Sequence, residues 1–461
     1  MARALDAVLW GPRDFVDRLA RSSPARLAVT AFAGIIAVFV GLLSMPVATA
    51  SGQRAPFVDA LFTATSAVSV TGLTTVPTGE YWSTWGHVVI LAGIQIGGFG
   101  VMTLASVLGL AVSRHIGLTS KLLAASETRT TRLGEVGTLI KTVVVASVSI
   151  ELVLALVLFP RLAVTEADVG SAAWHSVFYA VSSFNNAGFV PTPDGLVPYY
   201  ADWWVLLPII VGVFLGSLGF PVLMTLAATW RMGRRWRRWN LHTRLTLVTS
   251  LVLVAVGAVV VGAFEWNNPA TLGAQDGGAR VLSSLFAGVM PRSGGFATLD
   301  VGEMREATWL MTDALMFVGG GSASTAGGIK VTTLAVLVIA IIAEARGDRD
   351  MDVYGRRIPR STLRLAVAVS FVGATIVLVS CLVLLELTDW TLDVVLFEAL
   401  SAFGTSGLST GVTAELPDAG KYVIAALMFV GRTGTMTVAA ALALRERRRV
   451  IRYPEERPII G

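Results

Sequence analysis

Long and short apolar segments alternate along the chain, and this alternation limits its possible folds more than any other feature. Each long segment holds roughly 20 nearly uncharged residues, the length that an α-helix needs to cross a bilayer. They cover about residues 27–48, 86–112, 142–159, 203–229, 245–264, 308–342, 365–387 and 421–444. Because so many segments have this length, the sequence predicts a polytopic, all-α membrane protein.

Composition supports this class and argues against several others. The 461 residues are 54% hydrophobic and 15% charged, whereas soluble proteins carry about 25% charged residues. The net charge of +5 comes mostly from arginines between the apolar segments, which indicates membrane topology rather than nucleic-acid binding. A single cysteine, Cys381, leaves no basis for disulfides or a cysteine-rich metal site. Residues 1–26 are basic and show no signal-peptide cleavage site.

Basic residues gather after every second long segment. The clusters lie in the N-terminus, at Arg114 to Lys141, at 231–244, at Arg346 to Arg364 and at Arg445 to Arg457. Two crossings between successive clusters put them all on one side, which the positive-inside rule makes cytoplasmic. We therefore expect both termini in the cytoplasm. The opposite loops are richer in acidic residues, and such a surface attracts cations.

Between the long segments of each pair lies a third element that is too short to cross. The four segments are 57–74, 172–190, 280–298 and 391–409. Each has about 12 apolar, helix-compatible residues, giving roughly 18 Å of helix against a hydrocarbon core of about 30 Å. Each then ends in a polar tail with a glycine. This pattern predicts re-entrant segments, in which a half-helix enters the membrane and an extended strand returns.

The tail glycines repeat with a nearly constant period. Gly72, Gly188, Gly295 and Gly407 are separated by 116, 107 and 112 residues. A lone glycine in an apolar segment usually only permits close helix packing, but four in one place indicate an internal repeat. We expect four parallel copies of helix, pore half-helix, filter loop and helix, with eight transmembrane helices around a central pore. The expected divisions are 1–26 (cytoplasmic N-terminus), 27–115, 137–231, 244–345 and 362–446 (four repeats), and 447–461 (cytoplasmic tail).

Four such strands around one axis predict an ion-selectivity filter. Non-helical backbone at membrane depth is tolerated only where protein or a watery cavity surrounds it. Backbone carbonyls there can replace the water shell of a cation, and the negative ends of the half-helices favour positive charge. The expected filter residues are Val70, Thr71, Gly72, Asn186, Ala187, Gly188, Ser293, Gly294, Gly295, Thr405, Ser406 and Gly407. None carries a carboxylate, which favours a monovalent over a divalent cation.

Several motifs together resemble the Ktr/Trk/HKT superfamily of potassium transporters over nearly the whole chain. They are "SVTGLT", "SSFNNAGF", "SAFGTSGL", "IQIGGFGVMT", "GSLGFPVL", "GGSASTAGGIK", "FVGRTG" and "RYPEERPIIG". The likeness is greatest to the membrane-embedded, ion-translocating subunit of bacterial Ktr systems. The third copy, "PRSGGF", departs mildly from the family's usual threonine-rich form at Ser293 and Gly294.

The resemblance implies potassium uptake across a bacterial plasma membrane, through a filter with glycine in all four copies. It implies a homodimer on a cytoplasmic ring of RCK-type, nucleotide-binding subunits, with sodium as a possible activator. The chain itself carries no phosphate-binding loop of the G-x-x-x-x-G-K-[ST] type, so we expect no nucleotide on it. Its four histidines are scattered, which argues against a metal site other than that for K⁺ and against an enzyme.

A glycine-rich segment and an arginine lie below the expected filter. "MFVG" occurs at 316–319 and at 428–431, and its last residue stands 24 residues after Gly295 and after Gly407, so Arg432 is the counterpart of Gly320. A helix is not expected to persist through this glycine-rich segment. The resemblance makes it an intramembrane gating loop, with Arg432 as its counterpart across the cavity. The loop residues are Gly319, Gly320, Gly321, Ser322, Ala323, Ser324, Thr325, Ala326, Gly327 and Gly328.

Several alternatives stay open at this level. Arg432 could gate the pore, or it could be bound to loop carbonyls and stabilise the fold, and Asp313 could pair with it. Lys330 is expected to extend its amine towards the membrane surface, and Gln95 to bond between helices. The chief alternative function is an alternating-access secondary cation transporter driven by Na⁺ or H⁺. It would favour inverted repeats and charges in several spans, whereas the repeats here are parallel.

Overall fold

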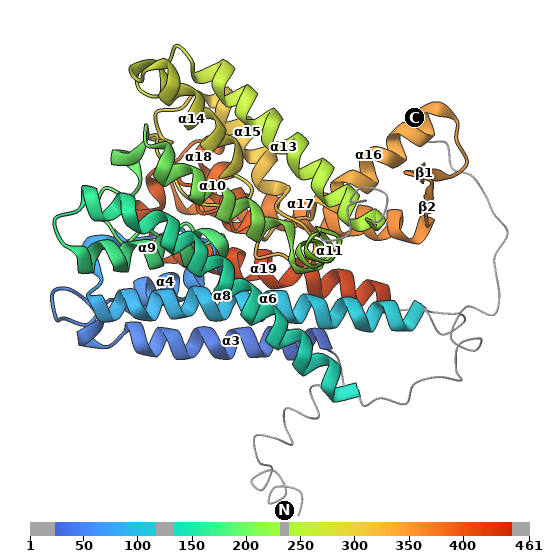
Figure 1. Cartoon of the computed structure of the whole chain (residues 1–461), viewed down its shortest axis with the longest axis horizontal. Coiled ribbons are helices and arrows are strands. Elements are labelled where there is room, and N and C mark those ends of the chain that lie inside the picture. The colour runs from blue at the N-terminus through green and yellow to red at the C-terminus, as the bar shows by residue number, and fades with distance from the viewer. Residues whose placement is uncertain (1–23, 117–131, 231–238, 445–461) are drawn as a thin grey trace, which may run out of the picture.

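The computed structural model describes residues 24–116, 132–230 and 239–444. In these residues the regular structure is helical apart from one two-stranded hairpin (Figure 1). Several sequence predictions fall wholly or mostly outside the described residues: the N-terminal segment 1–26, the tail 447–461, and much of the basic clusters around 117–131 and 231–238.

The helices follow one order four times: a long helix, a short helix and a second long helix or helix pair. The first copy has α3 (Pro24–Leu43), α4 (Phe57–Ser69) and α6 (Thr84–Ile116). The second has α8 (Arg132–Thr165), α9 (Val169–Phe184), α10 (Trp203–Leu218) and α11 (Phe220–Trp230). The third has α13 (Leu241–Glu265), α14 (Gly277–Val289), α15 (Glu306–Phe317) and α16 (Val331–Arg346). The fourth has α17 (Arg360–Leu387), α18 (Leu392–Gly404) and α19 (Asp418–Leu444).

Short elements connect these helices at the end of the molecule where the half-helices lie. They are α5 (Thr78–Tyr81) and the 3₁₀ turns η1 (Pro46–Ala48), η2 (Val197–Tyr199), η3 (Leu272–Ala274) and η4 (Val412–Glu415). The short helices α4, α14 and α18 have 13 residues each and α9 has 16. At 1.5 Å per residue this is about 20–24 Å, less than the roughly 30 Å of a bilayer core. All four lie towards the left of Figure 1.

The second span of the second copy is broken, although its sequence reads as one apolar segment, 203–229. Helices α10 and α11 meet at 103°. Gly219 between them has φ +90° and ψ 148°, angles that residues with a side chain rarely adopt. Pro221, the second residue of α11, lacks the N–H that a helix continuing from α10 would need. Hydrophobicity therefore predicted the span, while backbone chemistry sets its bend.

The third copy is interrupted at the place its glycines predict. Between α15 and α16 the chain is non-helical from Val318 to Lys330. A hairpin that the sequence did not predict follows α16. Strands β1 (Met351–Val353) and β2 (Arg356–Ile358) pair antiparallel around Tyr354 and Gly355, which have φ 51° and 71°. Two successive residues with positive φ are typical of a type I′ turn.

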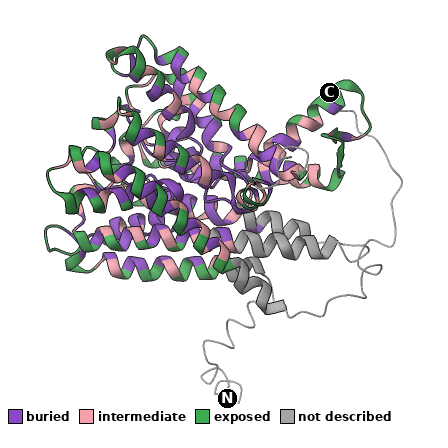
Figure 2. Ribbon diagram, viewed as in Figure 1, coloured by how far each residue is buried: buried purple, intermediate pink, exposed green. Residues whose placement is uncertain are grey.

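The distribution of buried and exposed residues is that of a membrane protein. Buried side chains fill the interior, while exposed ones follow the outer faces of the helices (Figure 2). The outer faces of α8, α13 and α17 carry large apolar residues such as Leu156, Val259 and Phe371, as contact with lipid requires. In the described residues, Ile140–Thr165, Leu241–Glu265 and Arg360–Leu387 are long and apolar enough to cross a bilayer, and α10 with α11 qualifies as one broken span.

A buried carboxylate joins the end of α13 to the start of α15 in the third copy. Glu265, at the end of α13, is fully buried. Its Oε1 accepts from the N–H of Arg305 at 2.9 Å and from Oγ1 of Thr308 at 2.5 Å. Its Oε2 accepts from Nδ2 of Asn268 at 2.6 Å and Oγ1 of Thr271 at 2.7 Å. The carboxylate thus accepts hydrogen bonds both from the start of α15 and from the loop after α13.

Replacing Glu265 with glutamine is expected to destabilise the fold. The amide offers one acceptor atom where the carboxylate offers two, so part of this network is lost, at about 2 kcal/mol. Thermal unfolding of the purified protein in detergent, followed by scanning fluorimetry, should show a lower midpoint. The exposed Glu303 supplies the matched control, because Glu303→Gln removes a charge without a buried partner. Equal midpoints for the two variants would contradict the interpretation.

Candidate functional site

The four glycines that the period singles out form a closed ring. A Cβ placed on Gly188 would lie 2.7 Å from Cα of Gly295, and one on Gly72 would lie 3.3 Å from Cα of Gly188. A Cβ on Gly407 would lie 3.1 Å from Cα of Gly295 and 3.2 Å from Cα of Gly72. The fourth copy therefore contacts both the third and the first, and the ring closes in chain order.

Backbone carbonyls line this ring. The residue before each glycine presents its carbonyl oxygen to the glycine of the preceding copy. A Cβ built on Gly72 would lie 2.3 Å from the oxygen of Ala187, and one built on Gly188 would lie 3.1 Å from the oxygen of Gly294. A Cβ built on Gly295 would lie 2.6 Å from the oxygen of Ser406, and one built on Gly407 would lie 2.2 Å from the oxygen of Thr71. Any side chain at these positions would therefore collide with backbone, which cannot move aside as a flexible side chain can.

Positive φ angles recur at the same two positions in every strand. The glycines have φ 96°, 71°, 73° and 87°. Two residues earlier stand Val70, Asn186, Ser293 and Thr405, with φ 55°, 61°, 76° and 46°. A left-handed conformation costs an L-residue about 1–2 kcal/mol, and it is a marked outlier for β-branched residues. Such strain concentrates at functional sites. These angles make each segment depart from a regular extended strand.

The first of these positive angles ends the half-helix abruptly. After α4, Val70 N–H donates to Ala67 O at 3.1 Å and Thr71 N–H donates to Ser66 O at 2.8 Å. These are the paired bonds of a Schellman motif, which satisfies the last helix carbonyls while reversing the chain. Strands two and four repeat the pattern through Ala187 and Ser406, whose N–H groups donate to Ser182 O at 2.7 Å and Ser401 O at 2.8 Å.

The third strand leaves its half-helix differently. Gly294 N–H donates to Met290 O at 2.7 Å, four residues back, where the other strands reach five residues back. This agrees with the sequence, in which Phe286 stands nine residues before its glycine and the other copies have ten. The left-handed angles at Ser293 and Gly295 are nevertheless kept. The departure of "PRSGGF" is therefore accommodated in the turn, and the strand still joins the ring.

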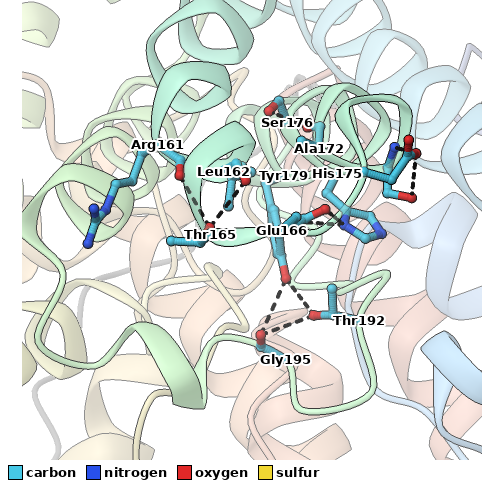
Figure 3. Close-up of polar contacts among 12 residues, drawn as sticks. Arg161, Leu162, Thr165, Glu166, Ala172, His175, Ser176, Tyr179, Thr192 and Gly195 are labelled. Carbon is cyan, nitrogen blue, oxygen red and sulfur yellow. Dashed lines mark hydrogen bonds and ion pairs between the residues drawn. The ribbon is translucent and has the colours of Figure 1, made fainter.

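Polar side chains on three half-helices hold the strands as they leave the ring. Figure 3 shows one of them: Tyr179 contacts Oγ1 of Thr192 at 2.7 Å and donates to Gly195 O at 3.3 Å. In the fourth copy the equivalent residue is Glu398, which likewise stands nine residues before its glycine. Its oxygens accept from Ser409 Oγ at 2.6 Å, the Thr410 N–H at 3.0 Å and Thr413 Oγ1 at 2.6 Å.

In the first copy the residue that holds the strand, Asp59, also forms an ion pair. Oδ1 of Asp59, in α4, accepts from Oγ1 of Thr75 at 2.8 Å and from Nζ of Lys421 at 2.8 Å. Lys421 belongs to α19, so this contact also joins the first copy to the fourth. His175, on α9, forms a separate contact of 2.9 Å between its Nδ1 and Oε1 of Glu166 (Figure 3), and this one links the half-helix to the end of α8.

The glycine-rich segment 319–328 lies directly against the ring and against the break in the second copy. Oγ1 of Thr325 donates to Oδ1 of Asn186 at 3.0 Å, and a Cβ on Gly327 would lie 2.3 Å from Oγ1 of Thr405. Gly321 N–H donates to Ser217 O at 2.7 Å, and Phe220 N–H donates to Ala323 O at 3.1 Å. The two non-helical stretches thus satisfy each other's backbone groups, as membrane depth requires.

Arg432 is 1% exposed and contacts this segment from the fourth copy. Its Nη1 donates to the carbonyl oxygen of Thr325, while Nε and Nη2 have no hydrogen-bond partner among the described residues. Asp313 does not pair with it: its Oδ1 has no such partner, and no ion pair between the two is present. The proposed Asp313–Arg432 pair is therefore absent from this structure.

Lys330 also differs from its expectation. Its Nζ donates to Ala326 O at 2.6 Å and to Gly327 O at 3.4 Å. The amine therefore folds back onto the loop instead of extending away from it. Together with Arg432, it places two cationic side chains on carbonyls of one segment. Among the described residues, neither has a carboxylate partner.

With this geometry in place, comparison with known proteins identifies the family. A family model described as TrkH, cation transport protein, matches residues 19–450. The chain belongs to the TrkH family of cation transport proteins. This confirms the resemblance drawn from the motifs, and it makes the protein a member of a transporter family rather than an enzyme family.

Two relatives and one solved structure show how far the similarity extends. The chain is 38% identical to the Ktr system potassium uptake protein B of Bacillus subtilis, over 97% of this chain and 99% of that protein. It is 33% identical to the potassium/sodium uptake protein NtpJ of Enterococcus hirae, over 96% and 98%. The crystal structure of the potassium transporter TrkH from Vibrio parahaemolyticus matches with TM-score 0.70 at 16% identity, over 89% of this chain and 84% of that one. The predicted polytopic all-α fold is confirmed.

The structure of this TrkH-family member also shows what the sequence missed. The four expected filter glycines and the carbonyl oxygens of the residues before them come together in one ring, and the segment 319–328 with Arg432 lies against it. The polar residues that hold the strands, Asp59, Tyr179 and Glu398, were not singled out as a set. Their signal was a polar side chain on three of the half-helices followed by a threonine beyond the glycine, in "SVTGLTT", "GFVPT" and "GLSTGVT".

Proposed function

We propose that this chain takes up potassium ions across the bacterial plasma membrane, as the ion-translocating subunit of a Ktr-type system. One observation carries the proposal: four strands with the same left-handed glycine form a closed ring lined by neutral backbone carbonyls. Such a ring can replace the hydration shell of a monovalent cation. The names of the relatives, which are potassium and potassium/sodium uptake proteins, support K⁺ as the ion.

The pore is proposed to run through one chain. Its four repeats would be residues 27–115, 137–231, 244–345 and 362–446, and this division is supported by the common order of helix, half-helix and helix. The segment 319–328 and Arg432 are proposed to gate the path below the ring. Parallel repeats and the local pairing of Asp59, Glu265 and Glu398 do not favour an alternating-access carrier.

The partners are proposed from the family and from charge. A homodimer is expected to sit on a cytoplasmic ring of RCK-type subunits that bind nucleotide, with Na⁺ as an activator and no nucleotide on this chain. Basic residues in the segments between repeats suit docking to such a ring, and they suit termini on the cytoplasmic side.

Complementation tests the function directly. Expression in a bacterium that lacks its own K⁺-uptake systems should restore growth at low external K⁺, and Rb⁺ uptake should be faster when an RCK-type partner is co-expressed. Because Gly411 has a positive φ but open space around it, Gly411→Ala serves as a control that should also complement. Failure of the wild-type chain to support growth, with the partner present and the protein detected in the membrane, would reject the proposal.

A further inference from the structure

A cluster of three polar side chains lies behind the second strand of the ring. Asn185 immediately precedes Asn186, the left-handed residue of that strand. Its Nδ2 donates to Oε1 of Glu151 at 2.9 Å and to Oε1 of Gln95 at 3.2 Å. Nε2 of Gln95 donates to both oxygens of Glu151, at 3.0 and 2.9 Å. Three elements, α6, α8 and the end of α9, therefore meet at one carboxylate.

The carboxylate is buried at membrane depth without a cation beside it. Glu151 is 6% exposed and lies within the apolar helix stretch Ile140–Thr165. No ion pair to it exists among the described residues. Its two oxygens accept all three of these hydrogen bonds from side-chain amides. A buried charge of this kind is costly, so an intramembrane carboxylate indicates a function.

Two glycines of α6 leave the space that this cluster occupies. Gly98 of α6 faces Asn185 so closely that a Cβ there would lie 1.9 Å from Oδ1 of Asn185. Its neighbour Gly97 would place a Cβ 2.0 Å from Val68 O, at the end of the first half-helix. The motif "IQIGG" thus supplies the amide of Gln95 and the space in which Asn185 fits. Small residues are the usual means of such close approach between helices.

The same position in the third strand is anchored in a related way. Asn185 and Arg292 each stand three residues before their filter glycine. Nη1 and Nη2 of Arg292 donate to the carbonyl and Oγ of Ser250, at 3.0 Å each. Ser250 lies 15 residues before the end of α13, and Glu151 lies 14 before the end of α8. In both copies the first helix holds the strand at this point.

The second strand is held from the opposite side as well. Oδ1 of Asn186 accepts from Oγ1 of Thr325 at 3.0 Å, and the carbonyl of Thr325 accepts from Arg432. Two adjacent asparagines therefore bind in two directions, one to the α6–α8 carboxylate and one to the segment 319–328. Both contacts therefore restrain side chains of this strand.

We propose that Glu151 is a positioning and specificity-determining residue for the ion that binds in the ring. Through Gln95 and Asn185 it fixes the left-handed turn at Asn186, and its negative charge favours a monovalent cation at the adjacent carbonyls. The inference rests on the proposed function of the ring as a K⁺ filter. Helix α8, whose outer face is apolar, thereby takes part in ion selection through its buried Glu151.

The test measures affinity and selectivity separately from maximal rate. Glu151→Gln keeps the volume of the side chain but removes its charge. In K⁺-uptake-deficient cells we expect the KM for K⁺ to rise about tenfold, as for loss of a group that orients a ligand-binding residue. The ratio of K⁺ to Na⁺ uptake should fall, while Vmax stays close to that of the wild type. Gln95→Leu, which leaves the carboxylate in place, should change KM in the same direction.

The controls separate positioning from general destabilisation. Glu265→Gln makes the same chemical change at a buried carboxylate outside the ring, so it should lower thermal stability and leave KM and the ion ratio unchanged. Purified protein adds a readout without transport: K⁺ should raise the unfolding midpoint of the Glu151→Gln variant less than that of the wild type.

Two results would overturn the inference. The first is an unchanged KM and ion ratio in Glu151→Gln, whether or not Vmax falls. The second, which applies if Glu151→Gln does not accumulate in the membrane, is an unchanged KM and ion ratio in Gln95→Leu. Absence of K⁺ uptake by the wild-type chain with its partner present would instead reject the proposed function itself.

Discussion

Replacing Gly407 with serine is expected to remove most of the discrimination between K⁺ and Na⁺. Gly407 has φ +87°, and a Cβ there would lie 2.2 Å from the carbonyl oxygen of Thr71. Because that oxygen belongs to the backbone of the neighbouring strand, the ring must widen or twist to make room. We expect the ratio of K⁺ to Na⁺ uptake to fall by about tenfold or more, equivalent to about 1.4 kcal/mol of differential binding.

The same copy supplies the matched control. Gly411 has φ +102°, but nothing lies within 4 Å of a Cβ placed there. Gly411→Ser therefore carries a similar backbone strain without the collision in the ring. Parallel measurements of K⁺ and Na⁺ uptake in cells that lack other K⁺ systems should separate the two variants. If both lose selectivity equally, strain in the outer loop would explain the effect, and the ring would not be the filter.

Replacing Arg432 with alanine is expected to speed K⁺ uptake while leaving its selectivity intact. The guanidinium is buried and holds the carbonyl of Thr325, on a segment that contacts two strands of the ring. A fixed positive charge there opposes a passing cation, and its only described hydrogen bond anchors the segment. Removing it should raise the initial rate of Rb⁺ uptake by about tenfold, as for other electrostatic barriers on ion paths.

Arg432→Lys separates the two contributions. The lysine keeps the charge but loses the planar guanidinium that reaches the loop. Rapid uptake in both variants would assign the barrier to the bond with Thr325, whereas slow uptake in Arg432→Lys alone would assign it to the charge. A lower uptake in Arg432→Ala, with normal amounts of folded protein in the membrane, would reject a gating role and favour a structural one.

The sequence predicted the architecture well where the information was periodic. The half-helices α4, α9, α14 and α18 were found because a glycine recurs about every 110 residues behind an apolar segment. The bend at Gly219 was missed because 203–229 is apolar throughout, and hydrophobicity does not distinguish one span from two halves. The hairpin β1–β2 was missed because its three-residue strands are too short for a clear alternation.

The four glycines of the ring were predictable for a similar reason, because they recur at a nearly constant period and glycine readily adopts left-handed angles. Val70 and Thr405 adopt such angles without being glycine or asparagine, so composition alone would not have found them. The support behind the ring was not predictable. Glu151, Gln95 and Asn185 are 34 to 90 residues apart, and no pattern in one sequence relates them. Gln95 was expected to bond between helices, and it does.

The interlocking of the two non-helical stretches limits how a passage below the ring can open. Gly321 N–H is bound to Ser217 O and Ala323 O to Phe220 N–H, so each stretch supplies backbone partners to the other. Separating them would leave polar backbone groups bare inside the membrane, at several kcal/mol each. The least costly displacement moves the segment 319–328 and the α10–α11 elbow as one body. A force applied to α11 would therefore reach the segment 319–328 through these hydrogen bonds, and through Thr325 it would reach Asn186 in the second strand of the ring.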